Sequence, residues 1–367
     1  MALPSAEDPW SDEALKSTLR DYFGVGADAD LSDEIRFLGG VARLIQKRII
    51  NGELDVISRL PGIFFLHPSH PSDVTGRPTS RVPMLDNGLH SVSNRLWFVN
   101  KVASDGTFVE LSPDDDDGKV FDLAVNEFNV GDLPTIVFEP RTKPAEARYY
   151  PGGLSKTDTY RLLRIDPLPI SLDQIFEVIE RLYQQEFCTP DAQGRAGKLW
   201  AKASHNWVAE DAEYKIQAAI RTGLIGSFPT CNVRVEQFQA TGRLDVELEE
   251  PSALDRTKIT RHALLELKVL RSRRSTGSVV PASRTKNWVR EGVEQAYSYR
   301  KERGCLHSAL CCFDMRLSPV EFCFEHVEDL ASQLAVALKS WYLFSSSEAY
   351  RHHLATTARG QEGPVDA

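Results

Sequence analysis

The chain has 367 residues, of which 42% are hydrophobic, so it is long enough for two domains with ordinary cores, and disorder throughout is excluded. It contains no run of roughly 18 apolar residues that could cross a bilayer, and its acidic, proline-containing start is unlike a signal peptide. We therefore expect a cytoplasmic protein without a membrane partner.

The formal net charge of −9 is distributed unevenly along the chain. Residues 1–170 carry 18 basic and 26 acidic side chains, whereas residues 256–303 carry 13 basic and 4 acidic ones. The acidity thus belongs to the first half, and the basic block favours a polyanionic partner in the second half.

The first half of the sequence predicts two helices followed by short strands. Helices are expected over residues 12–23 and 32–50, and the four adjacent aspartates 114–117 indicate a solvated loop rather than a cation site. A largely β domain with mixed structure is therefore expected over residues 1–170. Its acidity could keep a polyanion away until a ligand or protein partner relieves it, which would give the domain a regulatory or sensing role, or could simply confer solubility. The predicted strands, rich in β-branched and aromatic residues, cover residues 95–101, 108–111, 120–125, 135–139 and 160–165.

The second half predicts alternating helices and strands. Pro167 and Pro169 interrupt the chain, and Ser171 with Gln174 has the spacing of a capping box that opens a helix to about residue 187. We expect a second domain over residues 171–344 and a flexible tail over 345–367. Its other predicted helices cover residues 207–224, 288–303 and 328–344, and its strands 233–240, 243–249, 262–270, 308–315 and 322–324. The fold class is therefore mixed α/β (α+β).

Charged residues interrupt one of these apolar strands. Strand alternation places Glu266 and Lys268 on one face, and Leu265, Leu267 and Val269 on the other. Two charges on a buried strand cost free energy unless they pair or bind a cation. Taken alone, the pair is equally consistent with a buried ion pair that orders the sheet.

Asp245 on the preceding predicted strand adds a second carboxylate. Antiparallel pairing of the two strands would bring Asp245, Glu266 and Lys268 into one pocket. Two carboxylates suit Mg²⁺ or Mn²⁺, and Lys268 would orient or deprotonate a water molecule for attack on phosphorus. On the same strand, Glu247 and Glu249 share the parity of Asp245. Either could support the metal ligands through hydrogen bonds, but solvation at a sheet edge is the simpler interpretation of both.

The order Asp245, then Glu266-x-Lys268, resembles the signature of the PD-(D/E)xK, or restriction-endonuclease-like, nuclease superfamily. Gly242-Arg243-Leu244-Asp245 is similar to the glycine-containing form of its aspartate motif, with Leu244 where proline is familiar, and Gln295-x-x-x-Tyr299 is similar to an element of RecB-type nucleases. The resemblance covers roughly residues 207–316. It implies a restriction-endonuclease-like domain, with a mixed sheet flanked by helices, that cleaves DNA.

The resemblance also implies roles for further residues. Gln295 would lie beside the metal-bound water or the phosphate, Tyr299 would support the site or the nucleic acid, and Glu213 on the first core helix would complete the metal site. Helical spacing independently puts Glu213 on the face that holds Ile216 and Ile220, although a small error in register would make it an exposed residue.

A basic segment follows the Glu-x-Lys strand, and no acidic residue occurs between Lys268 and Glu291. A solvated loop could have this composition, but a segment that leaves a nuclease strand more plausibly tracks phosphates, with Trp288 available for stacking. The expected nucleic-acid contacts are Arg271, Arg273, Arg274, Arg284, Lys286 and Arg290.

The six cysteines lack any CxxC spacing, so buried free thiols are expected, and the spacing after residue 300 departs from that of the RecB-type subset with an iron–sulfur cluster. We expect a Mg²⁺- or Mn²⁺-dependent DNA endonuclease, with RNA not excluded, in an anti-phage effector gated by its first domain; cleavage of both strands would favour a homodimer. The alternatives are a non-catalytic nucleic-acid-binding or assembly module on the same fold, and a repair or junction-resolving nuclease.

Overall fold

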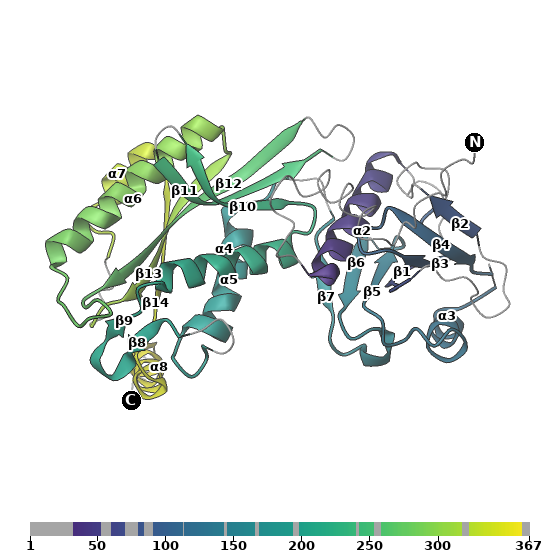
Figure 1. Cartoon of the computed structure of the whole chain (residues 1–367), viewed down its shortest axis with the longest axis horizontal. Coiled ribbons are helices and arrows are strands. Elements are labelled where there is room, and N and C mark those ends of the chain that lie inside the picture. Colours follow the sequence, from purple (N-terminus) through teal and green to yellow (C-terminus); the bar gives the residue numbers. More distant parts are fainter. Residues whose placement is uncertain are drawn as a thin grey trace, which may run out of the picture. The chain divides into compact units, whose positions relative to one another are not determined.

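A computed structural model of the chain describes residues 32–52, 60–69, 80–83, 91–112, 114–142, 145–165, 169–193, 198–239, 242–252, 258–317 and 323–361. These residues form two compact units of mixed α/β structure (Figure 1), which confirms the expected fold class. The first unit lies within residues 1–168, 225–232 and 251–259, and the second within 169–224, 233–250 and 260–367. The predicted helix over residues 12–23 falls outside the described residues.

The first unit is built on a seven-stranded sheet with the strand order β2-β4-β3-β1-β5-β6-β7. Helix α2 (Asp33–Ile50) begins at Ser32, whose hydroxyl accepts a hydrogen bond from the N–H of Ile35. Its apolar stripe shares one buried core with Phe64 and Trp97. The strands are β1 (Gly62–Leu66), β2 (Ser80–Pro83), β3 (Arg95–Val99), β4 (Asp105–Glu110), β5 (Thr135–Glu139), β6 (Glu146–Tyr150) and β7 (Arg161–Leu163).

The segment 120–125 is helical, so the strand predicted there is wrong. Helix α3 (Asp117–Asp122) continues into a π-helical turn, η3 (Leu123–Glu127), and the short η4 (Leu154–Lys156) follows later. Asp116 caps α3 by accepting from the N–H of Lys119 at 2.8 Å. The aspartate run therefore supplies a helix cap that outweighs the β-branched composition of the segment.

The second unit contains a mixed five-stranded sheet with the order β10-β11-β12-β13-β14, in which β12, β13 and β14 are parallel. Helices α6 and α7 lie on one side of this sheet, and α4 and α5 on the other (Figure 1). The capping box of Ser171 and Gln174 is present at the start of α4, as predicted. The elements are α4 (Leu172–Leu182), η5 (Tyr183–Phe187), β8 (Trp200–Lys202), η6 (Ala203–His205), β9 (Trp207–Val208), α5 (Ala212–Ser227), β10 (Asn232–Gln239), β11 (Gly242–Pro251), β12 (Ile259–Arg271), α6 (Ala282–Arg303), β13 (His307–Met315), α7 (Glu328–Leu334), β14 (Ala337–Tyr342) and α8 (Ser347–Gln361).

Four predictions at element ends need correction. The helix expected over 288–303 already begins at Ala282, after Pro281. The helix expected over 207–224 begins only at Ala212, because residues 207–208 pair as β9 with β8. The helix expected over 328–344 stops before Ala335, whose φ of 50° is left-handed, and β14 then pairs with β13 while Trp341 stacks on Phe313. The expected tail is largely helix α8, where Ser346 accepts from the N–H of Ala349.

Candidate metal centre

Glu266 and Lys268 lie side by side on β12, as strand alternation predicts. The strand is buried over most of its length, and the Glu266 side chain is 2% exposed. The ammonium of Lys268 donates to Oε1 of Glu266 at 2.6 Å. The pair is therefore a short hydrogen-bonded contact within the sheet.

Two further carboxylates reach the same strand from different elements. Oδ2 of Asp245 on β11 accepts from the N–H of Leu267 at 2.8 Å, and Oε2 of Glu213 on α5 accepts from the N–H of Val269 at 3.3 Å. The N–H groups of alternate residues point to the same side of a strand within the sheet, so both carboxylates lie along the same side of β12. Gln217, one turn after Glu213, donates to the carbonyl of Asp245 at 2.9 Å and ties α5 to β11.

The ionisation of Glu266 and Lys268 is shifted by burial and by their neighbours. Burial, with the charges of Asp245 and Glu213, raises the pKa of Glu266 to about 8, and Lys268 only partly opposes this. Burial alone would lower the pKa of Lys268, but the neighbouring carboxylates, with Glu266 first, raise it above its usual value. The raised pKa keeps Lys268 protonated.

Two buried oxygen atoms lack hydrogen-bond partners among the described residues: Oε2 of Glu266 on β12 and Oε1 of Gln295 on α6. Gln295 lies on α6, one turn after Gly292, where a Cβ would lie 2.7 Å from Leu310 and 3.4 Å from Cε of Lys268. Glycine thus lets α6 approach Lys268 closely. The unsatisfied Oε2 of Glu266, beside Asp245, fits a hard cation or its water ligands.

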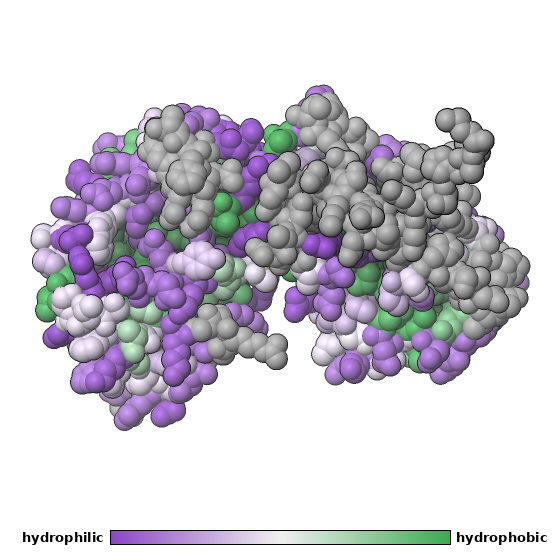
Figure 2. Space-filling view, viewed as in Figure 1, coloured by the Kyte–Doolittle hydropathy of each residue, from purple (hydrophilic) through white to green (hydrophobic). Residues whose placement is uncertain are grey.

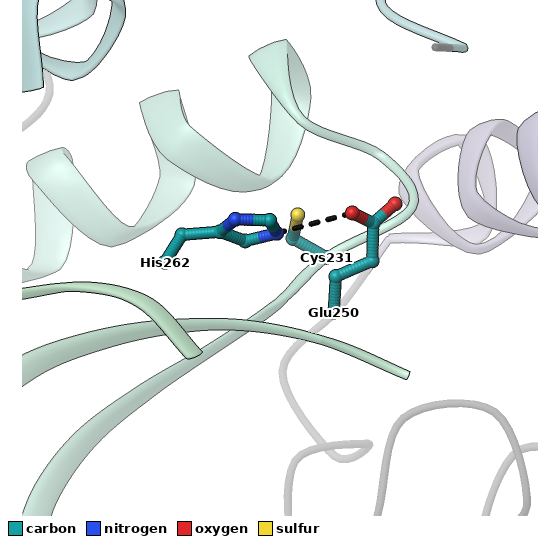
Figure 3. Close-up of side chains that lie close together, drawn as sticks. All are labelled: Cys231, Glu250 and His262. Carbon is teal, nitrogen blue, oxygen red and sulfur yellow. Dashed lines mark hydrogen bonds and ion pairs between the residues drawn. The ribbon is translucent and has the colours of Figure 1, made fainter. Parts of the chain in front are cut away.

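A second group of ligand-type side chains lies elsewhere (Figure 3). In the described part of the chain, the only three such residues whose ligand atoms all lie within 4.8 Å of one another are Cys231, Glu250 and His262, so Glu213, Asp245 and Glu266 are more widely spaced. Oxygen atoms spaced more widely than this cannot all contact one ion, so a Mg²⁺ ion here would bind at most two of the three carboxylates directly and reach the third through water.

His262 and Glu250 already form a hydrogen-bonded pair. The N–H of Ile170 donates to Nδ1 of His262 at 3.2 Å, and Nε2 lies 3.0 Å from Oε2 of Glu250. Because Nδ1 accepts, the ring proton lies on Nε2 and is donated to Glu250. Neither ring nitrogen is then left for a metal ion.

All six cysteines are buried with free thiols.

The predicted nucleic-acid contacts fall into two groups. Arg274, Arg284, Lys286 and Arg290 are exposed, and the guanidinium of Arg284 lies 5.1 Å from the ring centre of Trp288. Arg271 is half-buried near Glu213, and Nη1 of Arg273 donates to the carbonyl of Gly277 at 3.2 Å.

Tyr299 is 1% exposed and packs with Leu264 and Cys305, so its ring cannot contact nucleic acid directly. Glu247 and Glu249 are buried as well, against the expected solvation at a sheet edge. Glu247 accepts from Arg303 at 3.0 Å and Glu249 from Arg234 at 2.6 Å, because β11 is an interior strand whose charges require partners.

No protein-family model, curated protein or solved structure matches the chain. None of the described helices combines the length and the apolar character needed to cross a bilayer.

Proposed function

We propose that the second unit is a Mg²⁺- or Mn²⁺-dependent nuclease that hydrolyses phosphodiester bonds, most consistent with a DNA endonuclease. The observation that carries the proposal is the convergence of Asp245, Glu213 and the Glu266–Lys268 pair along one buried strand. An ion pair that merely orders a sheet needs no further carboxylates, and those present destabilise the charged form of Glu266.

Each residue then has a chemical role. Asp245 and Glu266 would bind the cation, helped by Glu213 and by the carbonyl of Leu267. When bound, the cation would polarise the phosphate and lower the pKa of a water ligand. Lys268, whose pKa is raised, would position the attacking water and stabilise negative charge as an ammonium rather than act as a base. Oε1 of Gln295 would accept a hydrogen bond from that water.

The wider context supports the same proposal. The mixed sheet flanked by helices agrees with the resemblance to PD-(D/E)xK nucleases, and exposed basic residues follow the Glu-x-Lys strand. DNA as substrate, and a role as an anti-phage effector gated by the first unit, rest on that resemblance and on the presence of an additional unit.

The direct test is cleavage of supercoiled plasmid, linear DNA, single-stranded DNA and RNA with Mg²⁺, Mn²⁺ or EDTA. We expect metal-dependent nicking that Lys268→Met and Glu266→Gln each reduce by about 10²- to 10⁴-fold. Lys215→Met is the matched control, because Lys215 belongs to the same unit but pairs with Asp211 at 3.1 Å.

Retention of full activity by Lys268→Met would contradict the assigned centre. If the protein binds nucleic acid but cleaves none of these substrates, the result would instead favour the non-catalytic module.

A further inference from the structure

The hairpin β8–β9 directly precedes α5 and lies against the basic turn 272–280 that follows β12. The N–H of Val208 points to the carbonyl of Arg273 at 3.5 Å. Gly277 has a φ of +84°, and a Cβ there would lie 2.5 Å from Cζ2 of Trp207. Only glycine combines this backbone conformation with so close an approach to the indole ring. The contact fixes the hairpin beside the strand that carries Glu266 and Lys268.

The tip of the hairpin gathers aromatic and basic side chains. Asn206, in a left-handed conformation with φ of 55°, turns the chain so that the rings of His205 and Trp207 lie 5.6 Å apart and 36° from parallel. The ammonium of Lys202 lies 5.5 Å from the centre of the Trp207 ring. His205 and Lys202 are both exposed, so the outer ring and a cation face the solvent.

The basic surface continues from the hairpin into the turn and the start of α6. Arg274 is exposed next to the glycine contact, and Arg284 lies over Trp288. The acidic side chains that follow the hairpin in the chain have basic neighbours: Asp211 pairs with Lys215, and the charge of Glu210 acts on Arg271.

On the face of the second unit that Figure 2 shows, hydrophilic residues predominate, and the apolar areas are small and separate. Charge and stacking, rather than a large apolar patch, are therefore the means of binding that this surface offers.

We propose that the β8–β9 hairpin and the turn 272–280 bind an unpaired strand of nucleic acid, with a base stacked on the His205–Trp207 pair and phosphates at Lys202 and Arg274. Base faces are covered by their neighbours in a duplex but are available in a single strand, and alternating aromatic and basic groups suit such a strand. The inference rests on the proposed nuclease function, whose substrate it narrows to ends, gaps or melted segments.

The test measures binding without cleavage. A fluorescein-labelled oligodeoxynucleotide of about 16 nucleotides, its RNA equivalent and the matched DNA duplex are titrated with the full chain in EDTA, and anisotropy is recorded. We expect the single strands to bind more tightly than the duplex. Trp207→Ala should weaken single-strand binding by about 5- to 150-fold, the range of a stacked base, and leave duplex binding within about twofold.

Two further variants guard against a folding defect. His205→Ala changes an exposed side chain and should weaken single-strand binding selectively. Lys202→Ala should weaken binding of both forms and reduce the salt dependence by about one phosphate contact. Tyr160→Ala is the matched control, since Tyr160 is an exposed aromatic of the first unit with Arg148 5.4 Å from its ring centre, and it should change neither.

Equal binding of single strand and duplex, or unchanged single-strand affinity in both His205→Ala and Trp207→Ala, would overturn the inference. Plasmid cleavage together with that result would leave the nuclease proposal intact. Selective single-strand binding without cleavage by the wild type would refute the nuclease proposal while supporting the hairpin surface.

Discussion

Glu266 is a carboxyl group whose protonation is linked to both folding and cation binding. Its pKa of about 8 exceeds the ordinary value of 4.5, so the cation-free fold favours the protonated form. Between these two values the unfolded chain holds fewer protons than the folded chain, and the free energy of unfolding falls as pH rises. A cation that replaces the proton should remove this loss of stability.

The linkage predicts that metal binding releases protons. Below pH 8, Mg²⁺ must displace the proton of Glu266, so the apparent affinity should rise with pH and level off above about 8. Isothermal titration calorimetry at pH 7, in buffers with different ionisation enthalpies, should show release of up to about one proton per ion. Glu266→Gln should abolish that release, and an unchanged release in this variant would assign the proton to another group.

Individual site residues differed in how well the sequence predicted them. Strand alternation is local, so it placed Glu266 beside Lys268 correctly, and helical spacing brought Glu213 to the sheet. The contact of Asp245 with the N–H of Leu267 depends on strand pairing, which the sequence supports through the succession of two strands joined by a short loop and through a family motif. A direct contact of Tyr299 with nucleic acid was predicted, but its ring is buried against Leu264 and Cys305. The Gln-x-x-x-Tyr spacing alone does not tell whether the tyrosine points into the core or to the surface.

At the scale of elements, the helix α2 depends on a glycine. A Cβ on Gly40 would lie 2.4 Å from the carbonyl oxygen of Val102, a backbone atom that cannot turn away. Gly40→Ala should therefore lower the free energy of unfolding of the first unit by about 1–3 kcal/mol or more, measured by urea denaturation. In Gly226→Ala the nearest atom is Nη1 of Arg161 at 3.9 Å, so this control should lose no stability.

Strand β11 depends on its buried charges. Glu247 is fully buried and accepts two hydrogen bonds of 3.0 Å from Arg303 of α6. Glu247→Ala should cost about 2–4 kcal/mol of stability in thermal or urea denaturation, slightly less than a wholly buried pair because Arg303 is partly exposed. The pair of Glu146 and Arg148, which is far more accessible to solvent, provides the contrast, and Glu146→Ala should cost less than about 1 kcal/mol. Equal losses would refute the role assigned to the buried pair.

Whole elements were predictable where one local signal dominated. The capping box correctly predicted the start of α4, and the apolar runs of the sequence correctly predicted the buried strands β12 and β13. The predictions failed where tertiary contacts decide. Residues 337–342 could continue a helix by composition, but pairing with β13 and the stacking of Trp341 on Phe313 make them a strand. Residues 120–125 have β-branched composition, and the cap at Asp116 makes them helical.

At the scale of the whole molecule, the first unit recruits two later segments of the chain, which a division near residue 170 does not include. Arg43 of α2 donates to the carbonyl of Thr230 at 3.3 Å and to Asn232 at 3.0 Å, and Phe228 beside them is buried. These contacts belong to the first unit itself.

A fragment of residues 1–168 should therefore be less stable than the same unit in the full chain. Hydrogen exchange of the α2 amides should be faster in the fragment, since it lacks the partners of Arg43. Arg43→Ala in the full chain should accelerate exchange in the same direction but to a smaller extent. Identical protection in the fragment and the full chain would show that residues 225–232 contribute nothing.

The division of residues 225–259 between the two units also constrains how the chain can fold during synthesis on the ribosome. Domains commonly fold one after another as the nascent chain emerges, with the N-terminal one first. Here the first unit lacks its last segment until residue 259 has been translated, by which time residues 169–224 and 233–250 of the second unit have already emerged. A premature stop between residues 169 and 259 would thus release neither unit whole, because the first unit would lack all or part of its late segments.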